Sequence, residues 1–166
     1  PGGYTFYVVS GGQQSDTSSS QVVQWWYAPP YLQSVTTFGD TAGGTNITIT
    51  GRNLGVSTPV VTIGSSAPGG PGMLPCTDVF RASSTKLYCR LAEGSGARLT
   101  VQVQVAELTG TLANAFSYSP PTFTGITVDG VTRSWRDAYN RPIPVWGPSS
   151  GAYLVTLTGA NFGVWD

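Results

Sequence analysis

The fold is decided by a stretch in the first third of the chain, which reads GGTNITITGRNLG and spans residues 43–55. Apolar and polar residues alternate in its middle, where Ile47 and Ile49 are each followed by a threonine. A period of two is typical of a β-strand with one face buried and the other in water. We therefore expect Ile47 and Ile49 to face a second sheet, with Thr48 and Thr50 on the outer side.

The end of this stretch returns later in the chain. Residues 49–56, ITGRNLGV, correspond to residues 157–164, LTGANFGV, at a displacement of 108 positions. In the first copy Gly51 and Gly55 bracket Asn53, a grouping suited to a tight bend or a bulge. A repeat of this kind indicates copies of one supersecondary unit.

Other short segments have the composition of strands and are separated by glycine, proline, serine and asparagine. Alternation is clearest in residues 99–105, LTVQVQV, and we expect further strands at residues 5–9, 21–27 and 154–158. Signals for helices are almost absent. Short strands with frequent turn residues favour an all-β sandwich over an α/β fold.

A second repeated motif, aromatic-x-Pro-Pro, sets the period of the repeat. It occurs at residues 27–30 and again at residues 118–121, a displacement of 91. The two displacements differ by 17, so we expect an insertion in the later copy, between residues 129 and 150. The predicted organisation is the closing strands of a preceding unit at residues 1–29, a complete unit at residues 30–120, and the opening strands of a following unit, with the insertion, at residues 121–166.

The repeated residues resemble those of the IPT/TIG family of immunoglobulin-like domains. The family pattern Gly-Gly-Thr-x-Ile-Thr-Ile-x-Gly-x-Asn-Phe/Leu-Gly matches residues 43–55. The other matching positions are Pro30, residues 61–64, Cys76, residues 87–89, Phe116, Tyr118 and Pro120. The resemblance implies an all-β, immunoglobulin-like β-sandwich of IPT/TIG type, with one complete domain flanked by partial ones.

Composition argues against several classes of function. Eight basic and eight acidic residues leave no net charge, and there is no basic cluster, so we expect no nucleic-acid partner. The chain has no histidine, which removes the usual general base and the commonest metal ligand. Its carboxylates are scattered, and no phosphate loop or nucleophile elbow occurs, so we expect neither enzymatic activity nor a cofactor.

The apolar runs and the ends of the sequence give two expectations, one about membrane spans and one about the length of the parent protein. No apolar run approaches the roughly 20 residues that span a bilayer, and we expect no membrane span in this segment. The chain starts at Pro1 and ends directly after a segment with strand composition. We expect it to be part of a longer protein.

Cys76 and Cys89 are the only cysteines. Structural zinc needs four ligands, and redox pairs are more often Cys-x-x-Cys. The interpretation that we prefer is a disulfide between neighbouring strands or loops, and the alternative is two buried thiols. A disulfide here would close a loop of 14 residues, contribute about 3 kcal/mol in the chain-entropy model, and indicate an oxidising, extracellular compartment.

Several residues are candidates for glycosylation. Asn46 begins the only Asn-x-Ser/Thr sequon and is the candidate for an N-linked glycan; the alternative is an unmodified residue at the start of a strand. The candidates for O-linked sugars, on hydroxylated proline in the case of the prolines, are Thr17, Ser18, Ser19, Ser20, Pro29, Pro30, Pro120 and Pro121. The alternative for these is an ordinary polar loop. A coat of sugars would be consistent with a surface in which only 10% of residues are charged.

The tryptophans are candidates for contacts between domains or subunits, where this residue type is favoured. Trp25 and Trp26 are adjacent, so in a strand they point to opposite faces and cannot both lie in the core of a two-layer sandwich. The full set of interface candidates is Trp25, Trp26, Trp135, Trp146 and Trp165. Core or edge packing and a platform for sugar rings are the alternatives.

From these features we expect a structural protein: a repeat segment of an extracellular, glycosylated fibre or cell-surface appendage. A half-sandwich leaves an open strand edge and an uncovered apolar face. Two complementary halves would therefore join, and the partners would be copies of the chain or adjacent repeats in a head-to-tail filament. The alternative is a cell-surface adhesion or carbohydrate-binding module.

Overall fold

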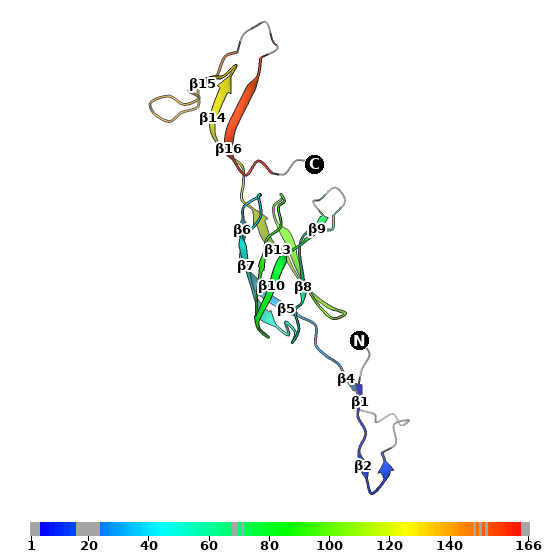
Figure 1. Cartoon of the computed structure of the whole chain (residues 1–166). Helices are drawn as coiled ribbons and strands as arrows, with labels where there is room; N and C mark the ends of the chain where they lie inside the picture. Colours follow the sequence, from blue (N-terminus) through cyan, green and yellow to red (C-terminus); the bar gives the residue numbers. More distant parts are fainter. Residues whose placement is uncertain are drawn as a thin grey trace.

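The computed structural model describes residues 4–15, 24–67, 70, 72–147, 149, 151 and 153–163, and these contain strands, turns and coil but no helix. Figure 1 shows the strands in three groups that follow one another along the molecule in chain order. No sheet in the described residues combines strands from two of these groups. The all-β class is confirmed.

The middle group is a sandwich of two sheets. The first sheet has the order β10 (Thr77–Ser83), β11 (Lys86–Arg90), β7 (Asn46–Arg52) and β5 (Tyr31–Val35). The second has the order β6 (Phe38–Gly39), β13 (Leu108–Tyr118), β12 (Leu99–Val105), β8 (Val60–Ser65) and β9 (Gly72–Pro75). Neighbouring strands are antiparallel except β6 and β13, which are parallel.

The core of the sandwich lies between these two sheets, and alternation along the strands builds it. Ile47 and Ile49 are completely buried, whereas Thr48 and Thr50 are half-buried on the outer side, as predicted. Strand β12 has the bounds that the sequence predicted and buries every second residue from Leu99 to Val103. The largest fully buried side chain in this core is that of Phe116 on β13.

The C-terminal group is a three-stranded sheet of order β15 (Val131–Arg133), β14 (Thr122–Val128) and β16 (Val155–Ala160). Its β14–β16 pairing repeats the β5–β7 pairing of the sandwich. Phe123 lies opposite Gly159 as Leu32 lies opposite Gly51, and each pair is followed by the same register shift. Strand β15 belongs to the predicted insertion and pairs with the outer edge of β14.

The N-terminal group is smaller than the sequence predicted. Strand β1 (Tyr4–Thr5) pairs with β4 (Gln24–Trp25), and β2 (Val9–Ser10) pairs with β3 (Gln13–Gln14). The prediction of one strand over residues 5–9 is wrong, because residues 6–8 are not in a strand. There Val8 is bound to Ser15 instead: its N–H donates to the Ser15 hydroxyl, and its carbonyl accepts from the Ser15 N–H.

The prediction of a strand over residues 21–27 also needs correction. Residues 21–23 lie outside the described part of the chain, and β4 ends at Trp25. Trp26 and Tyr27 continue as coil toward the two prolines, and proline cannot donate to a strand ladder. Trp25 nevertheless occupies the repeat position of Phe116, and its partner Tyr4 occupies the position of Leu99, which lies opposite Phe116.

Candidate assembly surface

The repeated Gly-x-Asn-x-Gly motif forms the same bend in both copies. Asn53 and Asn161 both have a φ of 58°, in the left-handed region that asparagine tolerates better than most residues. The side-chain amide of Asn53 donates to the carbonyl of Pro29 at 3.2 Å, and that of Asn161 donates to the carbonyl of Pro120 at 3.4 Å. Each asparagine therefore ties the end of its strand to the first proline of the motif that opens its unit.

The glycine two residues before each asparagine allows a close approach between strands. A Cβ atom at Gly51 would overlap the carbonyl of Tyr31, and a Cβ at Gly159 would overlap the carbonyl of Thr122. These carbonyls belong to β5 and β14, the repeat-equivalent strands. Glycine is needed here for space, and not for the positive φ that such turns often require.

The two copies differ in what covers their apolar face. In the sandwich, Leu32, Ile47, Ile49 and Leu54 are between 0% and 3% exposed. Their repeat equivalents are Phe123, Val155, Leu157 and Phe162, which are between 37% and 55% exposed. We call these four side chains the β14–β16 face; the described residues cover this side of the sheet only in part, since Val128, opposite Val155, is buried there.

The insertion covers one corner of this face. The ring of Trp135 packs against Phe123 with 4.7 Å between the ring centroids, and the Arg136 guanidinium lies 4.1 Å from the Trp135 ring centroid. A tight turn follows, in which the Asp137 carboxylate accepts the N–H groups of Tyr139 and Arg141 and pairs with the Arg141 side chain at 2.6 Å. The Arg141 N–H is the largest cause that holds the pKa of Asp137 below its usual value.

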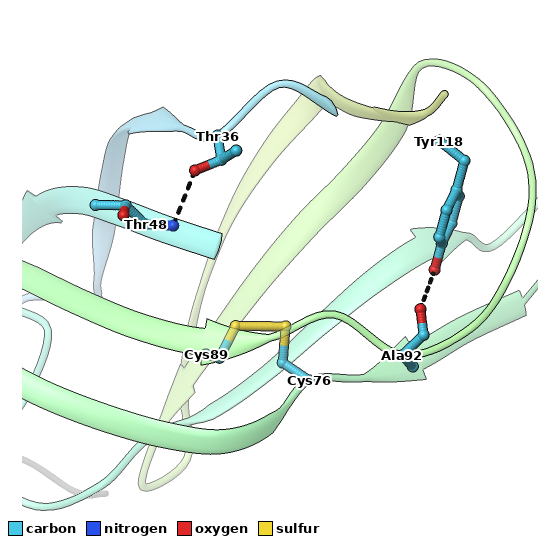
Figure 2. The surroundings of a disulfide bond; sticks show 6 residues. All are labelled: Thr36, Thr48, Cys76, Cys89, Ala92 and Tyr118. Atoms are coloured by element: carbon cyan, nitrogen blue, oxygen red, sulfur yellow. Dashed lines mark hydrogen bonds between the residues drawn. A yellow bond between two sulfur atoms is a disulfide. The ribbon is translucent and has the colours of Figure 1, made fainter. Parts of the chain in front are cut away.

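The segment that joins β1 to β2 is the second exposed apolar region. Phe6, Tyr7, Val8 and Val9 are all more than half exposed. Tyr27 is also more than half exposed, whereas its repeat equivalent Tyr118 is buried in the sandwich. There the Tyr118 hydroxyl donates to the carbonyl of Ala92 at 3.0 Å (Figure 2), and burial raises the pKa of its phenol.

Three of the predicted interface tryptophans have side chains in the described part of the structure, and these three do not form one patch. Trp26 and Trp146 are exposed, at 61% and 81%, and Trp135 is half-buried against Phe123. The backbone of Trp25 lies in β4, and its side chain is outside the described part of the structure. Trp165 also falls outside the described residues.

The two cysteines form a disulfide, which decides between the alternatives left by the sequence. Cys76 lies between β9 and β10, and Cys89 is on β11, with a Cα–Cα distance of 5.7 Å. Figure 2 shows the bond at the sandwich interior. Because β9 belongs to the five-stranded sheet and β11 to the four-stranded sheet, the disulfide fixes the connection between the two layers.

The glycosylation candidates differ in accessibility. Asn46 is exposed at the first position of β7, and Pro29, Pro120 and Pro121 are exposed as well. Pro30 is buried, and its ring and carbonyl lie where a Cβ on Gly110 would be, so the structure removes it from the candidates. Residues Thr17, Ser18, Ser19 and Ser20 lie outside the described part of the chain.

The described residues contain no candidate metal site. None of their histidine, cysteine, aspartate and glutamate side chains gather in groups of three or more that could hold a metal ion. Nor do those residues include a helix long and apolar enough to cross a membrane. An uncovered apolar face was expected for the C-terminal half-unit, but its residues were not named, although the displacements of 108 and 91 positions identify them.

A comparison with family models agrees with the sandwich. The family model described as the IPT/TIG domain matches residues 30–124. Among solved structures, the chain is similar to the full extracellular region of plexin A4, with 29% identity and a TM-score of 0.43. That match covers 61% of this chain and 9% of the plexin chain. No curated protein matches the chain.

Proposed function

The chain belongs to the IPT/TIG domain family, and from that premise we propose that it is a structural segment of an extracellular, glycosylated fibre or cell-surface appendage. In this proposal, incomplete IPT/TIG units join head to tail. One observation carries it: the β14–β16 face repeats the core positions of a finished sandwich and leaves them exposed.

The sandwich shows which strands would form the layer that the β14–β16 face lacks in the described structure. There the five-stranded sheet, with β12 and β13 at its centre, covers the apolar side of β5 and β7. The N-terminal segment supplies the repeat equivalents of β12 and β13, because Tyr4 pairs with Trp25 as Leu99 pairs with Phe116. We therefore propose residues 1–29 and 121–166 as parts of incomplete units, and the N-terminal strands of a second copy as the partner of the β14–β16 face.

A contact of this kind can repeat from one copy of the chain to the next without forming a closed ring. The exposed face is C-terminal to the sandwich, and the proposed partner strands are N-terminal to it (Figure 1). Different surfaces meet in a head-to-tail contact, and such contacts build a filament when the rotation does not return to the starting point. Among the described residues, β16 has no strand on its outer edge, where β7 has β11, and this edge could accept an additional strand.

The disulfide and the N-glycosylation sequon both fit an extracellular setting. Disulfides persist in oxidising compartments, and the Cys76–Cys89 bond joins the two layers of the sandwich. Asn46, the acceptor residue of the sequon, is exposed and accessible to modification in such a compartment. Glycans on Asn46 and on the exposed prolines would coat a surface that carries few charges.

The test is the assembly state of the chain and of two matched variants. Leu157→Asp places a charge on the β14–β16 face, and Val60→Asp places the same charge at a position of nearly equal exposure on β8, 57% against 55%. Sedimentation velocity and electron microscopy should show filaments for the original chain and for Val60→Asp, and monomers for Leu157→Asp. A chain that stays monomeric at high concentration would refute the proposal, as would filaments that survive Leu157→Asp.

Adhesion or carbohydrate binding is the second candidate function. The exposed rings of Trp26 and Trp146 favour it, because exposed aromatic rings can stack on sugars. Binding to a glycan array that is lost in Trp26→Ala would support this function. Binding that is unchanged in Trp26→Ala and in Trp146→Ala would reject both rings as its site.

A further inference from the structure

The outer side of the four-stranded sheet gathers positive charge. Strand alternation directs Arg52 on β7 and Lys86 and Arg90 on β11 to this side, because Ile49, Leu87 and Cys89 point into the core. We call these three cations the cationic face, and all three are exposed. The only acidic residue on the four strands is Asp78 of β10, and none of the three cations forms an ion pair with a carboxylate among the described residues.

Two of the cations border a shallow depression. It has a volume of about 380 Å³ and is lined by Gln33, Thr50, Gly51, Arg52, Thr85 and Lys86. The strand register brings these residues together, since Lys86 lies opposite Thr50 on β7 and Tyr31 of β5 lies opposite Arg52. The depression therefore combines two charged donors with an amide and two hydroxyls, groups that hydrogen-bond to anionic and hydroxyl oxygens alike.

Aromatic rings continue from the depression across the sheet. The Lys86 ammonium lies 5.4 Å from the centroid of the Tyr88 ring. Tyr88 stacks with Phe80 of the edge strand β10, with 6.5 Å between centroids and 17° between ring planes. Phe80 is 63% exposed, because no layer covers this side of the sheet in the described structure.

We propose that the cationic face and its neighbouring rings bind an anionic polysaccharide, one that carries carboxylate or sulfate groups. Guanidinium and ammonium groups that form no ion pair within the described part of the chain match the acidic groups. The rings of Tyr88 and Phe80 present apolar surface to the C–H faces of the sugars, and the hydroxyls and amide of the depression match sugar hydroxyls. A nucleic acid fits less well, because the disulfide indicates an extracellular setting.

The depression is separate from the proposed assembly surface and lies at the end of the cationic face away from the candidate glycan, which Arg90 adjoins. Asn46 lies opposite Arg90, at the other end of β7 from Arg52. Six residues of strand separate the two positions, about 20 Å. A glycan on Asn46 therefore leaves the depression accessible, and the polysaccharide that we propose comes from outside the chain.

Binding of immobilised chain to dextran sulfate, with unmodified dextran as the neutral probe, tests the proposal. The variant is Arg52→Gln with Lys86→Gln, and the matched control is Arg98→Gln with Arg133→Gln, which removes the same charge from two exposed sites elsewhere. We expect the original chain to bind dextran sulfate and not dextran. The first variant should bind about 4- to 25-fold more weakly, and the control should change less than about twofold.

Two further measurements separate a sugar site from a site for any polyanion. Phe80→Ala keeps every cation, and we expect it to weaken binding to dextran sulfate while binding to polyglutamate stays unchanged. Thermal unfolding followed by circular dichroism verifies that each variant is folded. Equal losses in the two double variants would overturn the proposal, and so would polyglutamate or single-stranded DNA binding as tightly as dextran sulfate to the original chain.

Discussion

Truncation at two repeat-equivalent positions should have very different effects on stability. Ile49 is completely buried between the sheets, and its equivalent Leu157 is 55% exposed on the β14–β16 face. Substituting Ile49 by alanine removes buried carbon atoms and leaves a cavity, which costs about 2–5 kcal/mol. Leu157→Ala removes a side chain that is only half covered and leaves no enclosed cavity, so we expect a cost of about 1 kcal/mol or less in the monomer.

The same comparison predicts how assembly changes the second value. The four side chains of the β14–β16 face together expose about as much surface as two uncovered apolar side chains, and covering them would contribute about 4 kcal/mol at roughly 2 kcal/mol each. Leu157 supplies more than a quarter of that exposed fraction. In the assembled state we therefore expect Leu157→Ala to cost about 2 kcal/mol, which approaches the cost of Ile49→Ala.

The assay is unfolding in urea, followed by circular dichroism for Ile49→Ala and by amide hydrogen exchange on β16 for Leu157→Ala. With a slope of about 1 kcal/mol per molar urea, Ile49→Ala should lower the midpoint by about 2–5 M or leave the sandwich unfolded. Exchange on β16 is measured at a concentration below assembly and again above it. Equal costs for the two substitutions in the monomer, or a cost for Leu157→Ala that is independent of concentration, would refute the reasoning.

Three other predictions test the structure around these surfaces. Reduction of the Cys76–Cys89 disulfide should lower the free energy of unfolding by about 3 kcal/mol, seen as a lower urea midpoint, and an unchanged midpoint would contradict the account of a loop constraint. Asn53→Ala removes the hydrogen bond to the carbonyl of Pro29 and puts alanine at a positive φ, so we expect a loss of about 1–2 kcal/mol in the same assay, against little change for Asn114→Asp on the exposed part of β13. The pKa of Asp137 is lowered in the folded state, so its contribution to the stability of this turn is present above its ordinary pKa and is lost as the pH falls through the lowered value. Backbone amides of the turn should therefore lose protection from hydrogen exchange below about pH 4. Protection that persists in Asp137→Asn would contradict this role.

The fold was largely predictable because its main signals are local. Alternation in residues 46–50 and 99–105 identifies strands with one buried face, and the structure places β7 and β12 there. The repeat indicated that the segment after Pro120 pairs like the segment after Pro29, and the matching registers of β5–β7 and β14–β16 agree. The N-terminal strands were predicted less well, because apolar composition at residues 5–9 and 21–27 does not say whether a neighbouring strand is present to pair with.

The candidate surfaces were less predictable than the fold. Phe123 and Leu157 have the apolar character of core residues, and the sequence does not show that their covering layer is absent from the described residues. Arg52 and Lys86 are 34 positions apart in sequence, and only the β7–β11 register makes them neighbours. A candidate list built on residue type alone therefore selected the tryptophans, which the structure leaves scattered, and omitted the cationic face.

By itself the sequence determined the strand periodicity, the IPT/TIG motif and the two repeat displacements, since each of these is a relation between residues close in the chain or between copies of one pattern. Tertiary structure decided the rest. It pairs Cys76 with Cys89, buries Pro30 against Gly110, and exposes the β14–β16 face while burying its equivalent. The physical reason is that burial and pairing depend on which strands meet across a sheet or between layers, and a residue's own neighbours in the chain do not specify that partner.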